Sequence, residues 1–405
     1  MDSYDLDSLI ICHKCHTLHH TMEIDYKSKV YCSKCKTVLY QNNPNLLNII
    51  LSISISTMIL FIISLLFPII EILVLGSRES FSLPSMVLML LEKQYYIVGF
   101  MLLFLLIIIP FLSISLYIFI SIFIKFKISP NITKQLLILL SNIKDWNMID
   151  IFLISILVAL VKLLSYFELN LGISFYALIL FVIFDLYLNK SIKIYDLWRV
   201  YQKNFNIKKE KKDFLENQLV RCHKCEAVNI DTDKEIDCRR CHQRIYHSKT
   251  KSINFTLAYL LTAMIAFIPA NFYPMLITYK FGNRTQSTII GGAIEMWDEG
   301  SYPIAFIILF ASIFIPIIKF ILILFLVISS NKDIKKVDKQ KIYYITEIIG
   351  PLSMIDVFVV SILSSLVHLS TLNIVAGPAA SAFAIMVFFT LLSALSFDTR
   401  LIKHR

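Results

Sequence analysis

Long apolar runs, separated by short polar stretches, make up most of the sequence. A helix needs roughly twenty apolar residues to cross the hydrocarbon core of a bilayer. Two apolar regions, 149–189 and 354–397, hold about forty residues each, more than one crossing needs, so each should fold back as a hairpin. The predicted spans are 46–70, 95–124, 149–167, 171–189, 253–273, 303–329, 354–371 and 375–397.

Composition agrees with this pattern. Of the 405 residues, 57% are hydrophobic and 17% are charged. Because the apolar residues are concentrated in the runs, an oily globular protein is a poor description. The sequence predicts an α-helical polytopic membrane protein. No signal peptide is expected before the first span, which follows 45 polar residues that include four cysteines.

The distribution of basic residues predicts the orientation. Loops rich in Lys and Arg stay in the cytoplasm, and the connections near 71–94 and 274–302 hold few of them. Both termini and the middle segment are therefore expected on the cytoplasmic side. The net charge of +10 then reflects topology and a membrane-facing surface, and no nucleic-acid partner is expected. The basic segments are 125–148, 190–252, 330–353 and the C-terminus.

All eight cysteines occur in Cys-x-x-Cys pairs outside the predicted spans. Two pairs separated by 16 or 12 residues form each set, which is the spacing of a zinc ribbon with four thiolate ligands. Small segments of this kind depend on the metal to fold, and four protein ligands leave no position open for a substrate. We expect two structural zinc sites: Cys12, Cys15, Cys32 and Cys35, and Cys222, Cys225, Cys238 and Cys241.

Two other kinds of metal site fit part of this pattern. The segment from Cys12 to His16 matches the Cys-x-x-Cys-His signature of c-type haem attachment. Haem would be attached on the outer face, however, and would not need a second cysteine pair. A rubredoxin-like iron site is the main competitor to zinc.

The two halves of the chain match at an almost constant offset of 206. "WNMIDIFLISILVALVKL" at 146–163 aligns with "LSMIDVFVVSILSSLVHL" at 352–369, and Pro68 and Pro110 align with Pro274 and Pro316. Four spans return the chain to its starting side, so the two repeats are expected to be parallel. The predicted domains are ribbon 1 at 1–45, repeat 1 at 46–189, a basic linker with ribbon 2 at 190–252, and repeat 2 with a basic tail at 253–405.

These features together resemble the paraquat-inducible protein A (PqiA/LetA) family of bacterial inner-membrane proteins. The resemblance rests on the repeated ribbon with four spans, on "SMIDVFVVSIL" at 353–363, and on "EMWDEGSYPIAFIILFASIFIPIIKF" at 295–320, which is similar to the family's Trp-x-x-Gly-x-x-Pro-Ile-Ala stretch. The first half departs from that stretch, because 92–100 has no Trp or Pro.

The resemblance implies a location and a function. Family members are similar in lying in the bacterial inner membrane beside a periplasmic tunnel protein built of MCE domains, and the pair is implicated in moving lipids between the two membranes. It therefore implies an MCE-domain partner and a phospholipid cargo for this chain.

Polar residues inside the spans are candidates for a transport path. Lys162 lies past the midplane of its span and aligns with His368, so the two could line a wet cavity; snorkelling of the lysine is the alternative. Spacings of three, four and seven place the second-half residues on one helical face, which could instead be a tight packing surface. The candidates are Lys162, Ser361, Ser364, Ser365 and His368.

Asp150 and Asp356 begin the third span of each repeat. A carboxylate there can cap free N–H groups at a helix start, so capping or a polar network is expected.

No nucleotide-binding, esterase or zinc-protease motif is present, so no enzymatic activity is expected. A function of another class also fits the cysteines: a membrane-bound redox or metal sensor whose pairs cycle between thiol and disulfide. The lack of a thioredoxin-like βαβ context weighs against it.

Overall fold

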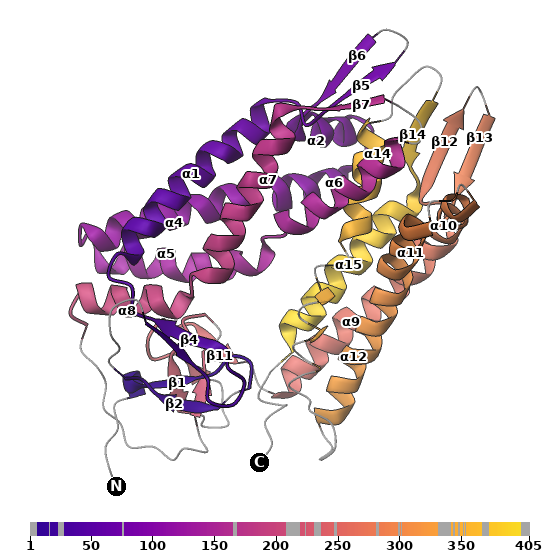
Figure 1. Ribbon diagram of the computed structural model, residues 1–405. Helices are drawn as coiled ribbons and strands as arrows, with labels where there is room; N and C mark the ends of the chain where they lie inside the picture. The colour runs from indigo at the N-terminus through magenta and orange to yellow at the C-terminus, as the bar shows by residue number, and fades with distance from the viewer. Residues whose placement is uncertain are drawn as a thin grey trace.

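The computed structural model has ribbons at one end, helices in the middle and small sheets at the other end (Figure 1). It describes the chain from 6 to 397 with short gaps. The residues outside the description are 1–5, 16, 23–27, 75–76, 165–167, 208–218, 223, 231–235, 247–248, 281–282, 299, 301, 331–341, 343–344, 347–348, 351, 353, 367–371 and 398–405.

The first half is built on three long apolar helices, in which α1 packs against both α4 and α7. A shorter helix, α5, fills the connection that the sequence assigns to the cytoplasm, and α8 follows the last long helix. The helices are α1 (Leu46–Leu66), α2 (Leu83–Glu92), α3 (Tyr96–Leu102), α4 (Ile109–Lys125), α5 (Pro130–Ile143), α6 (Ile149–Leu164), α7 (Ile173–Leu186) and α8 (Ile194–Asn204), with short turns η1 (Leu6–Ser8), η3 (Lys144–Trp146) and η4 (Tyr187–Ser191).

In the second half, α9 packs along α15 and α12. Figure 1 shows it beside the first half, in orange and yellow. Its helices are α9 (Lys249–Phe272), α10 (Ile289–Asp298), α11 (Tyr302–Leu309), α12 (Ile315–Ser330), α14 (Ile355–Leu366) and α15 (Pro378–Ser396).

A π-helical segment precedes a proline in each half. Segment η2 (Leu103–Ile108) lies just before Pro110, and η6 (Phe310–Phe314) just before Pro316. Proline lacks an N–H and its ring crowds the preceding turn, so the hydrogen-bond ladder changes register there. Each predicted second span therefore continues through its proline as one helix with an irregular segment.

Six helices in the described part of the chain are long and apolar enough to cross a bilayer. The two expected third spans are shorter: α6 has 16 residues and α14 has 12. The ends of spans 149–167 and 354–371 lie partly outside the described residues, so the count of eight stays a prediction. The six helices are Leu46–Leu66, Tyr96–Lys125, Ile173–Ser191, Lys251–Phe272, Phe310–Ser329 and Pro378–Ser396.

Two three-stranded antiparallel sheets lie at the end opposite the ribbons (Figure 1). In each sheet, the central strand follows the first long helix of its half. It pairs with the next strand along the chain and with the strand that connects the last two helices of that half, α6 to α7 or α14 to α15. The sheets are β6-β5-β7 and β13-β12-β14, from β5 (Ile70–Val74), β6 (Ser77–Phe81), β7 (Glu168–Leu171), β12 (Leu276–Lys280), β13 (Asn283–Ser287) and β14 (Leu372–Ala376).

The cysteine-rich segments fold into four short antiparallel hairpins, two in each ribbon. Each hairpin carries one Cys-x-x-Cys pair in the turn between its strands. The strands are β1 (Leu9–Ile11), β2 (Leu18–His20), β3 (Lys29–Tyr31), β4 (Val38–Gln41), β8 (Leu219–Arg221), β9 (Val228–Ile230), β10 (Ile236–Asp237) and β11 (Arg244–Tyr246).

The short helices α6 and α14 form the seam between the halves. They pack against each other, and Phe152 meets Phe358 edge to face with ring centroids 5.6 Å apart. From the first half, Lys93 donates to the Ser364 carbonyl at 3.2 Å and Tyr95 to the Ala376 carbonyl at 2.5 Å. One buried core runs through both halves, so they form a single packed body.

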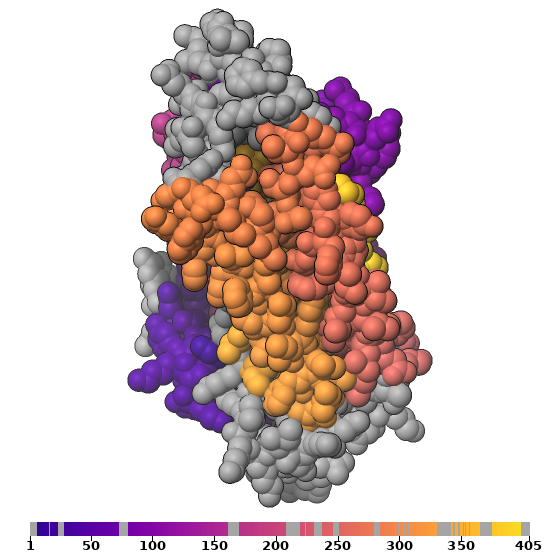
Figure 2. All heavy atoms as spheres, turned by 90° about the vertical axis from the view of Figure 1, so that its right-hand side faces the viewer, coloured from indigo at the N-terminus to yellow at the C-terminus, as the bar shows by residue number. Residues whose placement is uncertain are grey.

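The outer face of the second half is apolar. Figure 2 shows this face, covered mainly by α9 and α12. Phe306, Phe310 and Phe314 are exposed and stack along one helix, with ring centroids 5.8 and 6.3 Å apart. A row of exposed aromatic rings is costly in water and stable against lipid, which agrees with a multi-pass membrane protein.

Two glycines allow the closest backbone contacts of the sheets. Gly172 and Gly377 each donate an N–H to the carbonyl of the residue just before a strand, Ile69 at 2.9 Å and Met275 at 2.8 Å. A Cβ added to them would lie 2.0 Å from the Pro68 oxygen and 1.9 Å from the Pro274 oxygen. Only glycine fits where two backbones approach this closely.

We therefore expect Gly172→Ala and Gly377→Ala to destabilise the protein by roughly 2–3 kcal/mol each, the cost of overpacking. Thermal unfolding of purified protein in detergent measures the effect. Gly292→Ala is the matched control, because an added Cβ there meets nothing within 4 Å. Equal melting temperatures for all three variants would contradict the close approach.

Candidate metal centres and a cavity between the halves

The four cysteine turns share one backbone geometry. In each, the amide of the first cysteine donates to the carbonyl five residues later, at 2.8–3.0 Å. The residue after the second cysteine has a left-handed φ in the three turns where it is described, a conformation that costs a non-glycine residue about 1–2 kcal/mol. These residues are Lys36, Glu226 and His242, with φ of 55°, 59° and 57°.

The first cluster joins the turns of ribbon 1. The Sγ atoms of Cys12 and Cys35 lie 3.5 Å apart, and those of Cys15 and Cys32 lie 3.4 Å apart. Cys12 and Cys32 are buried, whereas Cys15 and Cys35 are half-buried.

The second cluster is enclosed on all sides. Its Sγ atoms lie 3.8 Å apart for Cys222 and Cys241 and 3.4 Å apart for Cys225 and Cys238. All four side chains are buried, none more than 2% exposed.

Both clusters fit a tetrahedral metal. Four bonds of about 2.3 Å from zinc to sulfur place the sulfurs about 3.8 Å apart. In each cluster the four sulfurs lie within 4.8 Å of one another. All eight cysteines are free thiols, so none is used in a disulfide. Each group could hold one metal ion, and the soft donor set suits zinc or iron.

Protons are shared unevenly within the clusters. Burial raises the pKa of Cys12 to about 12. Burial acts in the same direction on Cys35, but hydrogen bonds with Thr37 and Cys12 lower its pKa to about 6. In the second cluster, hydrogen bonding with Cys222 lowers the pKa of Cys238. A bound metal displaces such shared protons, so metal binding and proton release are coupled.

The two ribbons are joined by a buried ion pair and an apolar contact. The guanidinium groups of Arg239 and Arg240, inside a turn of ribbon 2, donate to Asp7 of ribbon 1 at 2.6 and 2.9 Å. Although burial opposes the charged form, the two guanidinium groups lower the pKa of Asp7. The apolar contact around this pair consists of Leu6, Leu9, Ile11, Leu219 and Val228.

Both ribbons rest on α8 of the first half. Tyr195 of α8 packs into the core of ribbon 1, while Trp198 packs into the core that contains the ribbon 2 cysteines. Asp196 accepts from the Gln41 amide at 3.4 Å, and burial raises its pKa to about 7. Helix α8 is tied in turn to the long helix α4, since Asn204 Nδ2 donates to the Ile124 carbonyl at 3.3 Å, and to α5, since Tyr201 donates to the Pro130 carbonyl at 3.0 Å. The metal sites are thereby connected to the helices of one half.

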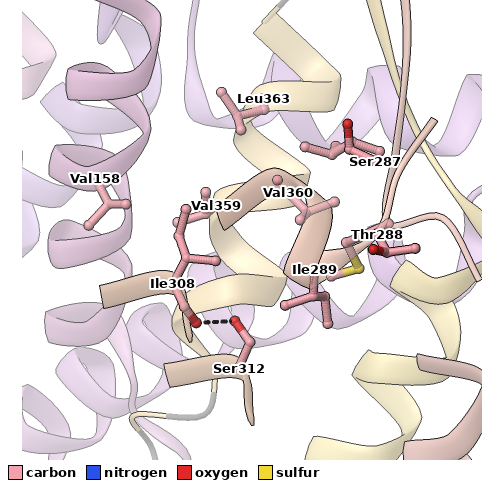
Figure 3. Close-up of a pocket in the computed structure, with 12 residues that line it drawn as sticks. Val158, Ser287, Thr288, Ile289, Ile308, Ser312, Val359, Val360 and Leu363 are labelled. Carbon is pink, nitrogen blue, oxygen red and sulfur yellow. Dashed lines mark hydrogen bonds between the residues drawn. The ribbon is translucent and has the colours of Figure 1, made fainter. Parts of the chain in front are cut away.

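An apolar cavity, partly open to the surroundings, lies at the seam (Figure 3); the space of about 540 Å³ within it includes open solvent. The polar side chains of its wall are Ser287, Thr288 and Ser312, and Ser312 donates to the Ile308 carbonyl at 2.6 Å. The cavity is lined by Val158 of α6, Val359, Val360 and Leu363 of α14, Met275, Leu276, Ser287, Thr288, Ile289 and Gly292 near the outer sheet, and Ile308 and Ser312.

Of the candidate path residues, Ser361 and Ser364 are described with their side chains, and neither lines this cavity. Ser361 is buried and donates to the Val357 carbonyl at 2.5 Å. Ser364 is buried and accepts from the Ala376 amide at 3.1 Å, which fastens α14 to the outer sheet. Lys162 lies on α6 and Ser365 on α14, but their side chains, like the whole of His368, lie outside the described residues. A path along this face stays a prediction.

Asp150 lies in the first turn of α6. Its Oδ1 accepts from the Ile151 amide at 3.0 Å, and its Oδ2 lies 3.6 Å from the Lys190 ammonium. Asp356 occupies the same place in α14, with its side chain outside the described residues. Nearby, Asn147 donates to both oxygens of the buried Asp185, at 3.1 and 2.9 Å.

The helical parts of the chain identify its family. Residues 47–202 and 253–405 match the paraquat-inducible protein A family. The chain belongs to the paraquat-inducible protein A (PqiA) family. Intermembrane transport protein PqiA of Escherichia coli (strain K12) is 30% identical over 405 residues, which cover 97% of this chain and 94% of the relative.

Two further relatives match over most of their length. The probable intermembrane transport protein of Haemophilus influenzae is 27% identical and covers 92% of this PqiA-family chain and 89% of its own. Lipophilic envelope-spanning tunnel protein A of Escherichia coli (strain K12) is 25% identical, with shares of 96% and 90%. No solved structure matches the chain. All three relatives carry the names of transport or tunnel proteins, which fits a protein that is not an enzyme.

Replacing one ligand should empty one metal site of this PqiA-family protein. We expect Cys32→Ser and Cys238→Ser each to lose one of two metal ions per chain, because each cluster has only four ligands. Elemental analysis of purified protein measures the metal content. Ser33→Ala, at the neighbouring exposed residue, is the control. Full occupancy in either cysteine variant would show that the clusters are not the metal sites.

Proposed function

We propose that the chain is the inner-membrane component of a lipid transport system, which moves phospholipid between the inner and outer membranes together with a periplasmic MCE-domain tunnel protein. The observation that carries this proposal is the apolar cavity at the seam, in a protein whose relatives are named for intermembrane transport. The MCE partner comes from the family resemblance.

The cavity has the character of a site for a lipid tail. It is partly open to the surroundings, so an acyl chain could enter it from the membrane side. Its wall is mostly aliphatic, while Ser287, Thr288 and Ser312 supply hydroxyl groups. An acyl chain gains from aliphatic contacts, and a headgroup needs polar neighbours.

The seam position also suits transport. The cavity combines one residue of α6 with residues from six elements of the second half. A relative movement of α6 and α14 would change its shape, because both helices contribute to its wall. We infer that the two halves open and close around the lipid.

The metal clusters serve the fold in this proposal. Each holds one structural zinc, since four protein thiolates leave no position for a substrate. Metal binding supplies the folding energy of hairpins too small to form a core, and it holds ribbons 1 and 2 beneath α8. A rubredoxin-like iron site would appear as iron in the elemental analysis. A redox sensor would appear as metal-free protein with readily oxidised thiols.

The remaining architecture is part of the proposal. The domains at 1–45, 46–189, 190–252 and 253–405 form two parallel repeats with eight spans, both termini and both ribbons in the cytoplasm, and the sheets in the periplasm. Support comes from the two sheets, which have the same strand order and whose first strands, Ile70–Val74 and Leu276–Lys280, begin 206 residues apart.

Filling the cavity tests the transport function. We expect Gly292→Leu to reduce co-purifying phospholipid roughly five-fold or more, since overpacking a filled site costs about 1–3 kcal/mol. Mass spectrometry measures the lipid, and survival of cells in detergent measures envelope protection. Gly292→Ala is the matched control, and Val360→Phe fills the same cavity from α14. Normal lipid content and normal envelope protection in both filling variants would show that the lipid does not pass through this cavity.

Thiol labelling tests the orientation. In intact spheroplasts, a cysteine at the exposed Thr285 should react with a membrane-impermeant reagent, while one at the exposed Lys127 should not. Unsubstituted protein gives the background from the native cysteines. Labelling at Lys127→Cys with none at Thr285→Cys would reverse the topology.

A further inference from the structure

In each cysteine cluster, a nitrogen-bearing side chain lies against the third cysteine of the set. His19 Nε2 lies 3.2 Å from Cys32 Sγ, and Asn229 Nδ2 lies 3.6 Å from Cys238 Sγ. Both side chains come seven residues after the first cysteine of their ribbon, on its second strand. His19 and Asn229 therefore occupy one position of the ribbon fold, and that position holds different groups.

The two side chains are fixed to different degrees. Asn229 is only 3% exposed, and both ends of its amide are used: Nδ2 donates to the Ala227 carbonyl at 2.9 Å, and Oδ1 accepts from the Arg239 amide at 2.9 Å. It thereby joins the two cysteine turns of ribbon 2. His19 is half-buried.

The cysteines of ribbon 1 are also less enclosed than those of ribbon 2. All four cysteines of ribbon 2 are buried, and Arg239 and Arg240 of its second turn are held by Asp7. In ribbon 1, Cys15 and Cys35 are half-buried, and each lies beside a threonine hydroxyl, at 3.1 and 3.2 Å. An incoming metal ligand can reach ribbon 1 without unfolding it.

We propose that the two metal sites are not equivalent: ribbon 2 holds its metal permanently, whereas ribbon 1 exchanges its metal with small chelators, and the residue at the position of His19 and Asn229 sets the rate. This inference rests on the proposal that both clusters bind zinc. Exchange replaces a thiolate–zinc bond by a chelator–zinc bond with no change of oxidation state. Solvent access and the residues hydrogen-bonded to the metal ligands control the rate of such exchange. Mutation of such residues typically lowers metal affinity by roughly 10–100-fold.

The first experiment follows zinc release from the purified full-length chain in detergent to an excess of a chromogenic chelator. We expect two zinc ions per chain, one leaving at least ten-fold faster than the other. Cys238→Ser should retain only the fast phase, and Cys32→Ser only the slow phase. Fewer than two zinc ions at the start would overturn the proposed zinc sites. Two zinc ions that leave at one rate, or a fast phase from ribbon 2, would overturn the inference alone.

The second experiment exchanges the residue at the shared position. An asparagine in ribbon 1 can reproduce the amide bridge, with the Thr17 carbonyl and the Ser33 amide as partners at the places of Ala227 and Arg239. We expect His19→Asn to slow the fast phase about ten-fold and His19→Ala to accelerate it, with the melting temperature unchanged.

Asn229→Ala should accelerate the slow phase by a similar factor. His20→Asn, at the exposed next residue of β2, is the control and should leave both phases unchanged. A residue that only supported the fold would give changes of the same sign in His19→Asn and His19→Ala. That result, or unchanged rates in all variants, would exclude His19 and Asn229 as positioning residues.

Discussion

Hydrocarbon offers no hydrogen-bond partner to a backbone amide, and this constraint determines where each kind of structure can occur in the chain. The long helices satisfy their own backbone groups, so they can take the middle of the molecule. Strands with open edges and the cysteine-rich turns lie at the two ends, where water or other protein groups can form hydrogen bonds with them. The π-helical segments before Pro110 and Pro316 are the irregular parts inside the long helices.

Sequence patterns predicted the features that depend on nearby residues. Six of the expected spans correspond to long helices, because an apolar run of twenty residues has few alternatives. The cysteine sets were predictable because a Cys-x-x-Cys turn brings its own two sulfurs together. The short helices α6 and α14 were less predictable, since helices buried in a seam and helices in lipid are equally apolar.

Features formed by distant residues could not be read from such patterns. Asp7 meets Arg239 and Arg240 across more than 230 residues, and no local periodicity encodes that contact. The outer sheets were missed for the same reason, because β5 pairs with β7 nearly a hundred residues later. The serine face of α14 was recognised, yet spacing alone could not show that Ser361 and Ser364 bond to backbone groups.

The π-helical segment η6 has a consequence for how the second half can move. A π turn holds about one residue more than an α turn, so its conversion to regular helix would rotate the following helix by about 100° and draw it along its axis by about 1.5 Å. Ser312 lies in this segment and forms part of the cavity wall. The cavity thus has one wall built on a stretch of helix that can change register in a discrete step, like a ratchet, while the surrounding helices keep their hydrogen bonds.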